Sequence, residues 1–187
     1  MAKTKSNTTI VPPNKMALAV SVAARVQIQS IHVVEMFGKQ SLLNGKLPTQ
    51  LSIAVKTSPE VHAQQHTIDI RAKFVLLGRY TDSDTGEPPL QISAEFVIRY
   101  SLNSTEGLTK EHYDAFAELN GIHNGWPYWR EYVQSVTTRM GFPPLAIPVS
   151  RLVAAGSPLL EAKPTGQIEK APDSKRKQLK HQKKKAN

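Results

Sequence analysis

The sequence predicts an α+β domain in which a four-stranded antiparallel sheet carries helices on one face. Two observations lead to this prediction. Four segments with alternating apolar residues come first along the chain, and two segments with helical spacing of apolar residues follow them. Strands that precede helices in this way favour an antiparallel sheet with one buried face.

The four strands are predicted from residues 25–37, 50–56, 68–76 and 90–100, where apolar and polar residues alternate. A break in this alternation near Ser30 predicts a β-bulge in the first strand. Residues 57–66 are mostly polar and contain a proline, so we expect a connection there. Residues 81–89 are rich in turn-forming residues and predict a hairpin loop between the two longest strands.

Two helices are predicted after the sheet. The first begins at Thr109, a suitable N-terminal cap, and ends at Gly121. A loop over residues 120–125 follows. The second helix starts at Pro127, because proline suits a first helical turn, and ends at Gly141. Its apolar stripe consists of Trp129, Tyr132, Val133, Val136 and Met140.

An extended exit follows the second helix. Leu145, Ile147 and Val149 alternate with other residues, and Pro148 stiffens the segment. Residues 153–155 are interpreted as the end of a short helix. The predicted organisation is therefore a mobile extension over residues 1–24, a domain over residues 25–153, and a disordered tail rich in proline, glycine and lysine over residues 154–187.

The net charge of +9 is concentrated at the two ends of the chain. Residues 1–15 carry +3 and residues 170–187 carry +7, which leaves −1 for the residues between them. A nucleic-acid interface is therefore predicted only for the tails, chiefly for Lys175–Lys185, where binding would depend strongly on salt.

Other kinds of site find little support in the sequence. The chain has no cysteine, which excludes disulfides, cysteine-based zinc sites and thiol nucleophiles. Asp82 and Asp84 resemble the start of a calcium loop, but the glutamate that should end the loop is missing. His62 and His66 have metal-like spacing without a third ligand nearby. We predict no catalytic residue, no enzyme activity, no metal and no cofactor.

The N-terminal region has the outline of a signal peptide, with lysines before a short apolar run over residues 16–24. Prolines interrupt the approach, few residues of the run are bulky, and Arg25 follows at once. We therefore favour an extension that leads into a short helix or strand. No apolar run reaches the ~20 residues of a membrane span, and we predict a soluble, cytoplasmic protein without membrane insertion.

Three segments carry a resemblance to a known family. Residues 26–31 read Val-Gln-Ile-Gln-Ser-Ile, and residues 127–135 contain Pro-Tyr-x-Arg-Glu with a later serine. Arg139 is followed by Phe-Pro-Pro-Leu over residues 142–145 and by Pro-Val over residues 148–149. In order and content these segments resemble the opening strand, the second helix and the exit of the SecB family of protein-export chaperones.

The resemblance implies a homotetramer, arranged as a dimer of dimers, that binds non-native polypeptides in apolar grooves without ATP during protein export. The competing interpretation of the apolar residues is ordinary core packing. Ile122 and Trp126 are the preferred groove residues because both are predicted in a loop. The full set predicted to bind unfolded polypeptide is Tyr113, Phe116, Ile122, Trp126, Phe142, Leu145 and Ile147.

The resemblance also implies a docking surface for the SecA motor, whose basic tail binds the acidic sheet surface of family members. Glu35 supplies one acid on the first strand, but Lys39 stands at the next expected position, and the chain ends in a basic tail that would repel a basic partner. Two alternatives stay open beside a general chaperone. One is a nucleic-acid- or ribosome-associated protein that works through its tail, and the other is a chaperone or scaffold dedicated to a single partner such as an antitoxin.

Overall fold

The computed structural model describes residues 8–41, 47–80 and 87–154. The chain divides into two units, residues 1–157 and residues 158–187, and the second unit lies wholly outside the described residues. The predicted tail therefore lies outside them except for its first residue, and so do Lys175–Lys185 and the calcium-like pair Asp82 and Asp84.

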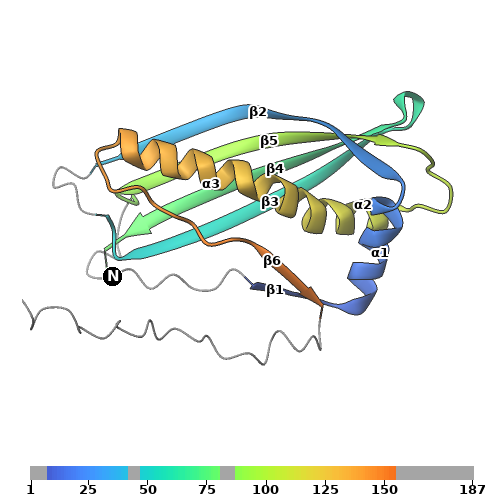
Figure 1. Ribbon diagram of the computed structural model, residues 1–187, viewed down its shortest axis with the longest axis horizontal. Helices are drawn as coiled ribbons and strands as arrows, with labels where there is room; N and C mark the ends of the chain where they lie inside the picture. The colour runs from blue at the N-terminus through green and yellow to red at the C-terminus, as the bar shows by residue number, and fades with distance from the viewer. Residues whose placement is uncertain (1–7, 42–46, 81–86, 155–187) are drawn as a thin grey trace, which may run out of the picture. The chain divides into compact units, whose positions relative to one another are not determined.

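A four-stranded antiparallel sheet in the order β2-β5-β4-β3 forms the centre of the first unit. The helices lie on one side of this sheet (Figure 1). The predicted fold class is therefore confirmed. The strands are β2 (Val26–Gln40), β3 (Gln50–His62), β4 (Thr67–Arg79) and β5 (Leu90–Leu102).

The predicted connection over residues 57–66 is wrong, because β3 continues to His62 and only Ala63–Gln65 form a short 3₁₀ turn. Pro59 lies within β3, opposite Ile70 of β4. A proline is tolerated in an edge strand, where its nitrogen can face away from the ladder. The predicted bulge near Ser30 is confirmed, and a second irregularity lies between Val33 and Glu35.

The two helices follow one another without the predicted loop. α2 (Lys110–Phe116) continues through a π-helical turn over Ala117–Gly121 into α3 (Ile122–Arg139). Thr109 caps α2 as predicted, within a capping box in which its backbone N–H donates to Nδ1 of His112 at 3.2 Å. The loop expected over residues 120–125 is therefore wrong.

The predicted helix boundaries are wrong because the glycines of this segment allow close packing on the sheet and do not end a helix. A Cβ added to Gly121 would lie 2.6 Å from Cγ2 of Ile70, and one added to Gly125 would lie 3.1 Å from the ring of Phe74. Both glycines let the helical segment approach β4 closely. Pro127 accordingly lies inside α3 and not in its first turn. It costs one backbone hydrogen bond, and the packing of the helix on the sheet compensates for that loss.

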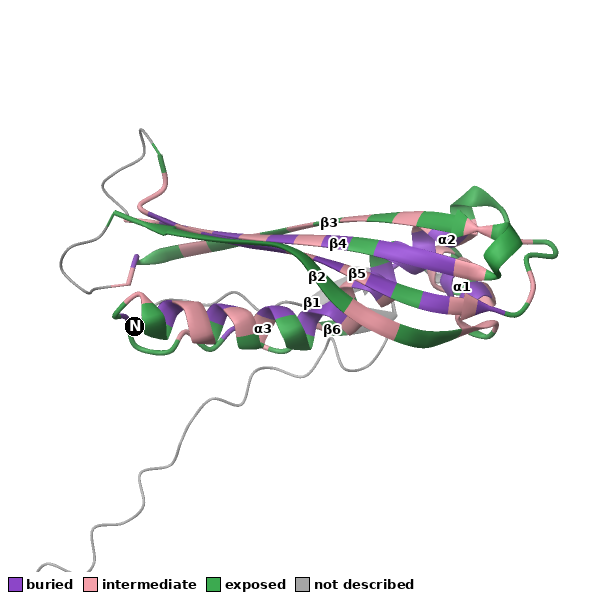
Figure 2. Cartoon of the chain, turned by 90° about the horizontal axis from the view of Figure 1, so that it is seen from above, coloured by how far each residue is buried: buried purple, intermediate pink, exposed green. Residues whose placement is uncertain are grey.

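The core lies between the sheet and the helices, in two neighbouring clusters. The larger cluster contains Phe74, Trp126 and Trp129, and the rings of Phe74 and Trp129 stack at 5.5 Å. The smaller cluster contains Tyr100 and Phe116, whose rings meet edge to face at 5.1 Å. Buried residues concentrate on β4, β5 and the inner side of the helices (Figure 2).

The N-terminal region contains two further elements, β1 (Thr8–Val11) and α1 (Pro13–Ala23). β1 pairs in parallel with β6 (Arg151–Ala154), and the two form a separate two-stranded sheet within the described part of the chain. Residues 153–155 were expected to end a short helix, and the strand β6 corrects this for the described residues 153 and 154.

Candidate polypeptide-binding surfaces

The helices cover the two central strands of the sheet and leave both edge strands partly open. Core-facing residues of β4 and β5, such as Phe74 and Ile98, are fully buried. No residue of β2 or β3 is buried, although both strands are described throughout. Figure 2 shows this contrast between the central strands and the exposed β2. Two partly apolar margins therefore border the helix layer.

The first margin lies on β2 and consists of Ile28, Val33 and Met36. These side chains are 45%, 45% and 55% exposed. Residues directly opposite each other in an antiparallel pair share one face of the sheet. The margin therefore belongs to the face of the sheet that carries the helices, although its side chains stay about half exposed. The opposing residues are the buried Tyr100, Phe96 and Ala94 of β5.

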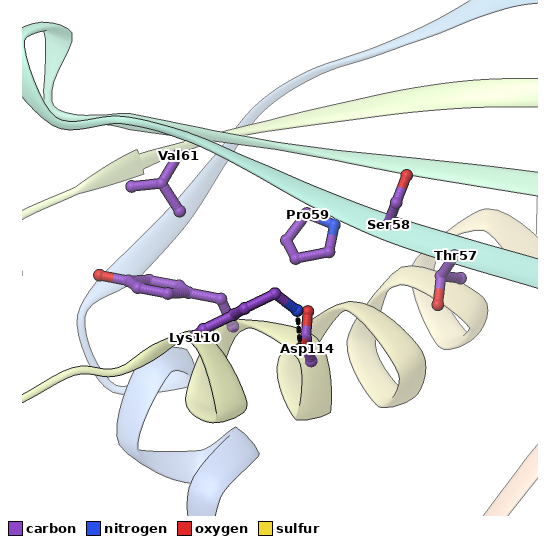
Figure 3. A pocket seen from close by; sticks show the side chains of 7 residues that line it. Thr57, Ser58, Pro59, Val61, Lys110 and Asp114 are labelled. Atoms are coloured by element: carbon purple, nitrogen blue, oxygen red, sulfur yellow. Dashed lines mark hydrogen bonds and ion pairs between the residues drawn. The ribbon is translucent and has the colours of Figure 1, made fainter.

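The second margin lies on β3, where a cavity of about 570 Å³ opens between the strand and α2 (Figure 3). Pro59 and the 37% exposed Val61 give this groove an apolar wall. Lys110 and Asp114 form an ion pair at its border. We call this cavity the β3 groove. It is lined by Thr57, Ser58, Pro59, Val61, Lys110, Tyr113 and Asp114.

Tyr113 is the only one of the seven predicted binding residues that lines the β3 groove. Its side chain is largely buried, and this burial raises the pKa of the phenol. The phenol is neutral at physiological pH, as it would be at the ordinary tyrosine pKa of about 10. An aromatic ring with a polar tip beside an apolar wall suits polypeptides of varied sequence.

The other six predicted residues lie elsewhere. Phe116 is buried in the smaller core cluster. Ile122 and Leu145 are partly buried against the larger cluster, which also contains the buried Trp126, Phe142 and Ile147. The Trp126 indole donates to the carbonyl of Pro148 at 2.8 Å, which fastens the exit segment to α3. Their described contacts are packing contacts, and their role in binding stays a prediction.

Pro59 and Val61 are groove residues that the sequence prediction missed, because residues 57–66 were interpreted as a connection. The available signal was weak. Val55, Thr57, Pro59 and Val61 continue the two-residue spacing of the strand, although only two of them are strongly apolar. A proline in the middle obscured the pattern.

The face of the sheet opposite the helices carries matched charges. Arg99 donates two hydrogen bonds to Asp69, at 2.8 and 2.7 Å, and Lys73 donates to Glu35 at 2.7 Å. The hydrogen bonds from Arg99 lower the pKa of Asp69, and Glu35 raises the pKa of Lys73. Glu35, the predicted docking residue, is thus exposed but already paired. Its docking role stays a prediction.

Among the described residues, no group of three or more histidine, cysteine or acidic side chains could hold a metal ion. His62, whose metal-like spacing with His66 was noted, has its Nε2 3.5 Å from Asp69. No helix in the described ranges is long and apolar enough to cross a membrane.

Comparison with solved structures assigns the fold. The SecB-like chaperone of Mycobacterium tuberculosis, solved in complex with a ChAD peptide from the antitoxin HigA1, superposes with a TM-score of 0.61. The chain has a SecB-like fold. The alignment covers 73% of this chain and 98% of the mycobacterial one, at 20% sequence identity. The two chains thus share a fold although their sequences differ strongly.

Other comparisons add little. A Streptococcus agalactiae protein of unknown function aligns over 66% of this chain and 96% of its own, at 12% identity and a TM-score of 0.38, which is too low to support an argument. No protein-family model matches the chain. No curated protein matches it either.

Proposed function

We propose that the chain is an ATP-independent chaperone that holds non-native polypeptides, with an extended apolar segment of the client in the β3 groove. The observation that carries this proposal is the open cavity of about 570 Å³ between an uncovered edge strand and α2. Uncovered apolar surface next to a groove is unusual on a protein without a partner and suits peptide binding. The SecB-like fold supports the same function.

A narrower version of this function has a specific observation in its favour. The similar mycobacterial chaperone was solved with a peptide from an antitoxin. A chaperone dedicated to one such client could use the same β3 groove. The general and the dedicated chaperone differ in the number of unrelated clients that they bind.

We further propose that β2 is the edge through which two copies associate, as a step toward a dimer of dimers. β2 exposes apolar side chains along its length, namely Val34 and Phe37 in addition to the residues of the first margin. The edge of β3 is less suited to strand pairing, because Pro59 lacks an N–H to donate. The proposed place of action is the cytoplasm, in protein export. Docking to SecA forms no part of the proposal, because Glu35 is paired with Lys73.

Suppression of aggregation tests the proposal. A chemically unfolded model protein is diluted into buffer with the full chain, with Val61→Asp, or with Val149→Asp. Both valines are exposed, at 37% and 49%, but only Val61 lines the β3 groove. We expect the full chain and Val149→Asp to suppress aggregation and Val61→Asp to lose most of this effect. If Val61→Asp matches the full chain, the groove is not the binding site.

A chain ended at Ala155, measured at low and high salt, separates the groove from the tail. If the shortened chain still suppresses aggregation at both salt concentrations, the described domain carries the activity. Suppression by the full chain alone, lost at high salt, would move the activity into the basic tail and favour the nucleic-acid alternative. If no form suppresses aggregation, the general chaperone function is overturned.

A further inference from the structure

The segment over residues 8–23, made of β1 and α1, covers a surface formed by β6, α2 and the π-helical turn. β1 contributes one strand to the parallel pair with β6, in which Thr8 lies opposite Arg151 and Val11 opposite Ala154 (Figure 1). α1 packs along α2. We call this segment the N-terminal cover.

The strand pairing of the N-terminal cover is intrinsically weak. β1 and β6 have four residues each and belong to no larger sheet in the described part of the chain. Parallel pairs are less stable per residue than antiparallel ones, and two-stranded sheets are marginal in water. The pairing therefore depends on the packing of α1 beside it.

The helix of the cover is also weakly stabilised. α1 has 11 residues, and no side chain caps its start at Pro12. It has no acidic residue in its first turn and no basic residue in its last. Isolated helices shorter than about 12–15 residues are marginal in water, so α1 is held mainly by its contacts with the rest of the domain.

The contacts of the N-terminal cover with the domain differ between its two ends: small side chains pack near its start, and a core residue anchors its end. Val11 and Ala19 pack against Ala115 and Leu119 in a cluster of four buried residues, and Lys15 forms an ion pair with Glu118. At the other end of α1, Val22 is fully buried in the core cluster that contains Tyr100 and Phe116. The backbone also continues directly into β2. The cover can therefore open as a unit that pivots near Val22.

We propose that the surface under the N-terminal cover is a second polypeptide-binding surface and that the cover is its internal competitor. Opening frees the backbone edge of β6 and uncovers Ala115 and Leu119. A free strand edge beside an apolar patch accepts an extended peptide by strand addition. The preferred client segment is extended, short, β-branched and apolar, because the present occupant reads Thr-Thr-Ile-Val over residues 8–11. This inference rests on the proposed chaperone function and adds its regulation.

A reversible lock tests the inference in the full chain. Thr8 and Arg151 are opposite each other in register, and neighbouring strands lie about 5 Å apart, which suits a disulfide. Because the chain has no cysteine, Thr8→Cys with Arg151→Cys creates a single possible bridge. The probe is a fluorescein-labelled synthetic peptide with the sequence of residues 6–14. A control peptide carries aspartate in place of Ile10 and Val11.

We expect the reduced double variant to bind the probe peptide and the oxidised form to bind it at least about tenfold more weakly, because the lock removes the open population. The control peptide should bind neither form. A second disulfide between Gln27→Cys and Ser101→Cys, which are opposite each other on β2 and β5, should leave probe binding unchanged on oxidation. Equal affinities of the oxidised and reduced double variant, or no binding to the reduced form, would overturn the inference.

A charge exchange gives an independent measurement. Lys15→Glu places two acids together and should open the cover and tighten probe binding several-fold. Adding Glu118→Lys restores an ion pair of opposite direction and should return the affinity to that of the unmodified chain. If the Lys15→Glu variant binds the probe peptide with the same affinity as the unmodified chain, the cover is not a competitor for this surface.

The two proposals can fail separately. If aggregation suppression depends on Val61 and probe binding does not change when the disulfide forms, the chaperone function stands and the second binding surface is excluded. If the oxidised and reduced forms differ in probe binding but no form suppresses aggregation, the regulated surface stands and the holdase function is excluded.

Discussion

Two segments, α3 and the N-terminal cover, lie over other parts of the domain, and the packing that holds them differs greatly in extent. α3 covers the larger core cluster with two tryptophans, and the Trp129 side chain is completely buried against Phe74. The N-terminal cover is fixed near its start by Val11 and Ala19, which are small. A buried aromatic side chain removes about 150–250 Å² from water, several times more than an alanine methyl group does. The difference indicates that α3 is permanent core structure and that the cover is exchangeable.

This comparison also bears on where the two proposed binding surfaces lie. A surface can receive a client only if its own covering is absent, as at the β3 groove, or weak, as under the N-terminal cover. Surfaces that are covered by large aromatic residues cannot be reached without unfolding, because the loss of that packing costs a large part of the stability of a domain.

The strongest test of the comparison is Trp129→Ala. We expect a loss of about 3–5 kcal/mol in the free energy of unfolding, measured by urea denaturation, because a large cavity forms in the core. The Trp129 indole N–H has no hydrogen-bond partner among the described residues. Trp129→Phe should therefore cost much less, since it removes an unsatisfied donor and keeps an aromatic ring. Equal losses for the two variants would contradict this account of the core.

Gly121 tests the point where the π-helical turn, which lies under the N-terminal cover, meets α3. Gly121→Ala improves helix propensity by about 1 kcal/mol, but its methyl group would lie 2.6 Å from Cγ2 of Ile70. We expect overpacking to prevail, with a net loss of about 1–3 kcal/mol in urea denaturation. Combining it with Ile70→Ala should show favourable coupling, because the clashing atom is gone. Simple additivity would show that the close approach is unimportant.

The sequence predicted those parts of the fold in which local pattern and tertiary environment agree. β4 and β5 alternate clearly because the apolar side chains of each lie on one buried face, whereas the other face is polar and mostly partly exposed. The continuation of β3 beyond Lys56 was missed because Pro59 is acceptable only at an edge, and edge position is a property of the sheet and not of the segment. Gly121 was interpreted as a helix end because its packing partner, Ile70, is distant in sequence.

The candidate site was harder to predict for a related reason. Core residues and groove residues are both apolar, so the sequence cannot separate Phe142, which is buried, from Val61, which lines the groove. The pairing of β1 with β6 joins tetrapeptides at opposite ends of the domain, and neither carries a local signal of its partner. Tyr113 lines the groove because the helical face on which it was predicted also reaches β3, and its role in binding stays a prediction.

A smaller change tests the weak covering alone. Val11→Ala removes two buried methyl groups at about 0.8 kcal/mol each, so local opening should become about tenfold more frequent. We expect faster amide hydrogen exchange in β6, measured by mass spectrometry, and unchanged exchange in β4. Ala23→Gly at the pivot serves as a control for helix fraying. Parallel acceleration in β4 and β6 would mean that the cover opens only with the whole domain.

The smallest expected effect concerns the charged face of the sheet, which lies opposite the helices. Arg99 holds the pKa of Asp69 below its ordinary value, mainly through its two hydrogen bonds. The ion pair therefore contributes stability above the unfolded pKa of about 3.9, and this contribution is lost as the pH falls through the lower folded value. Because the Arg99 side chain is 48% exposed, solvent screening keeps the contribution small. Asp69→Asn should lower the urea midpoint at pH 7 slightly and flatten its decline at acid pH. The control is Glu60→Gln, because the exposed Glu60 carboxylate also lies near His62, and it should change neither. An unchanged acid slope in Asp69→Asn would show that other carboxylates control acid unfolding.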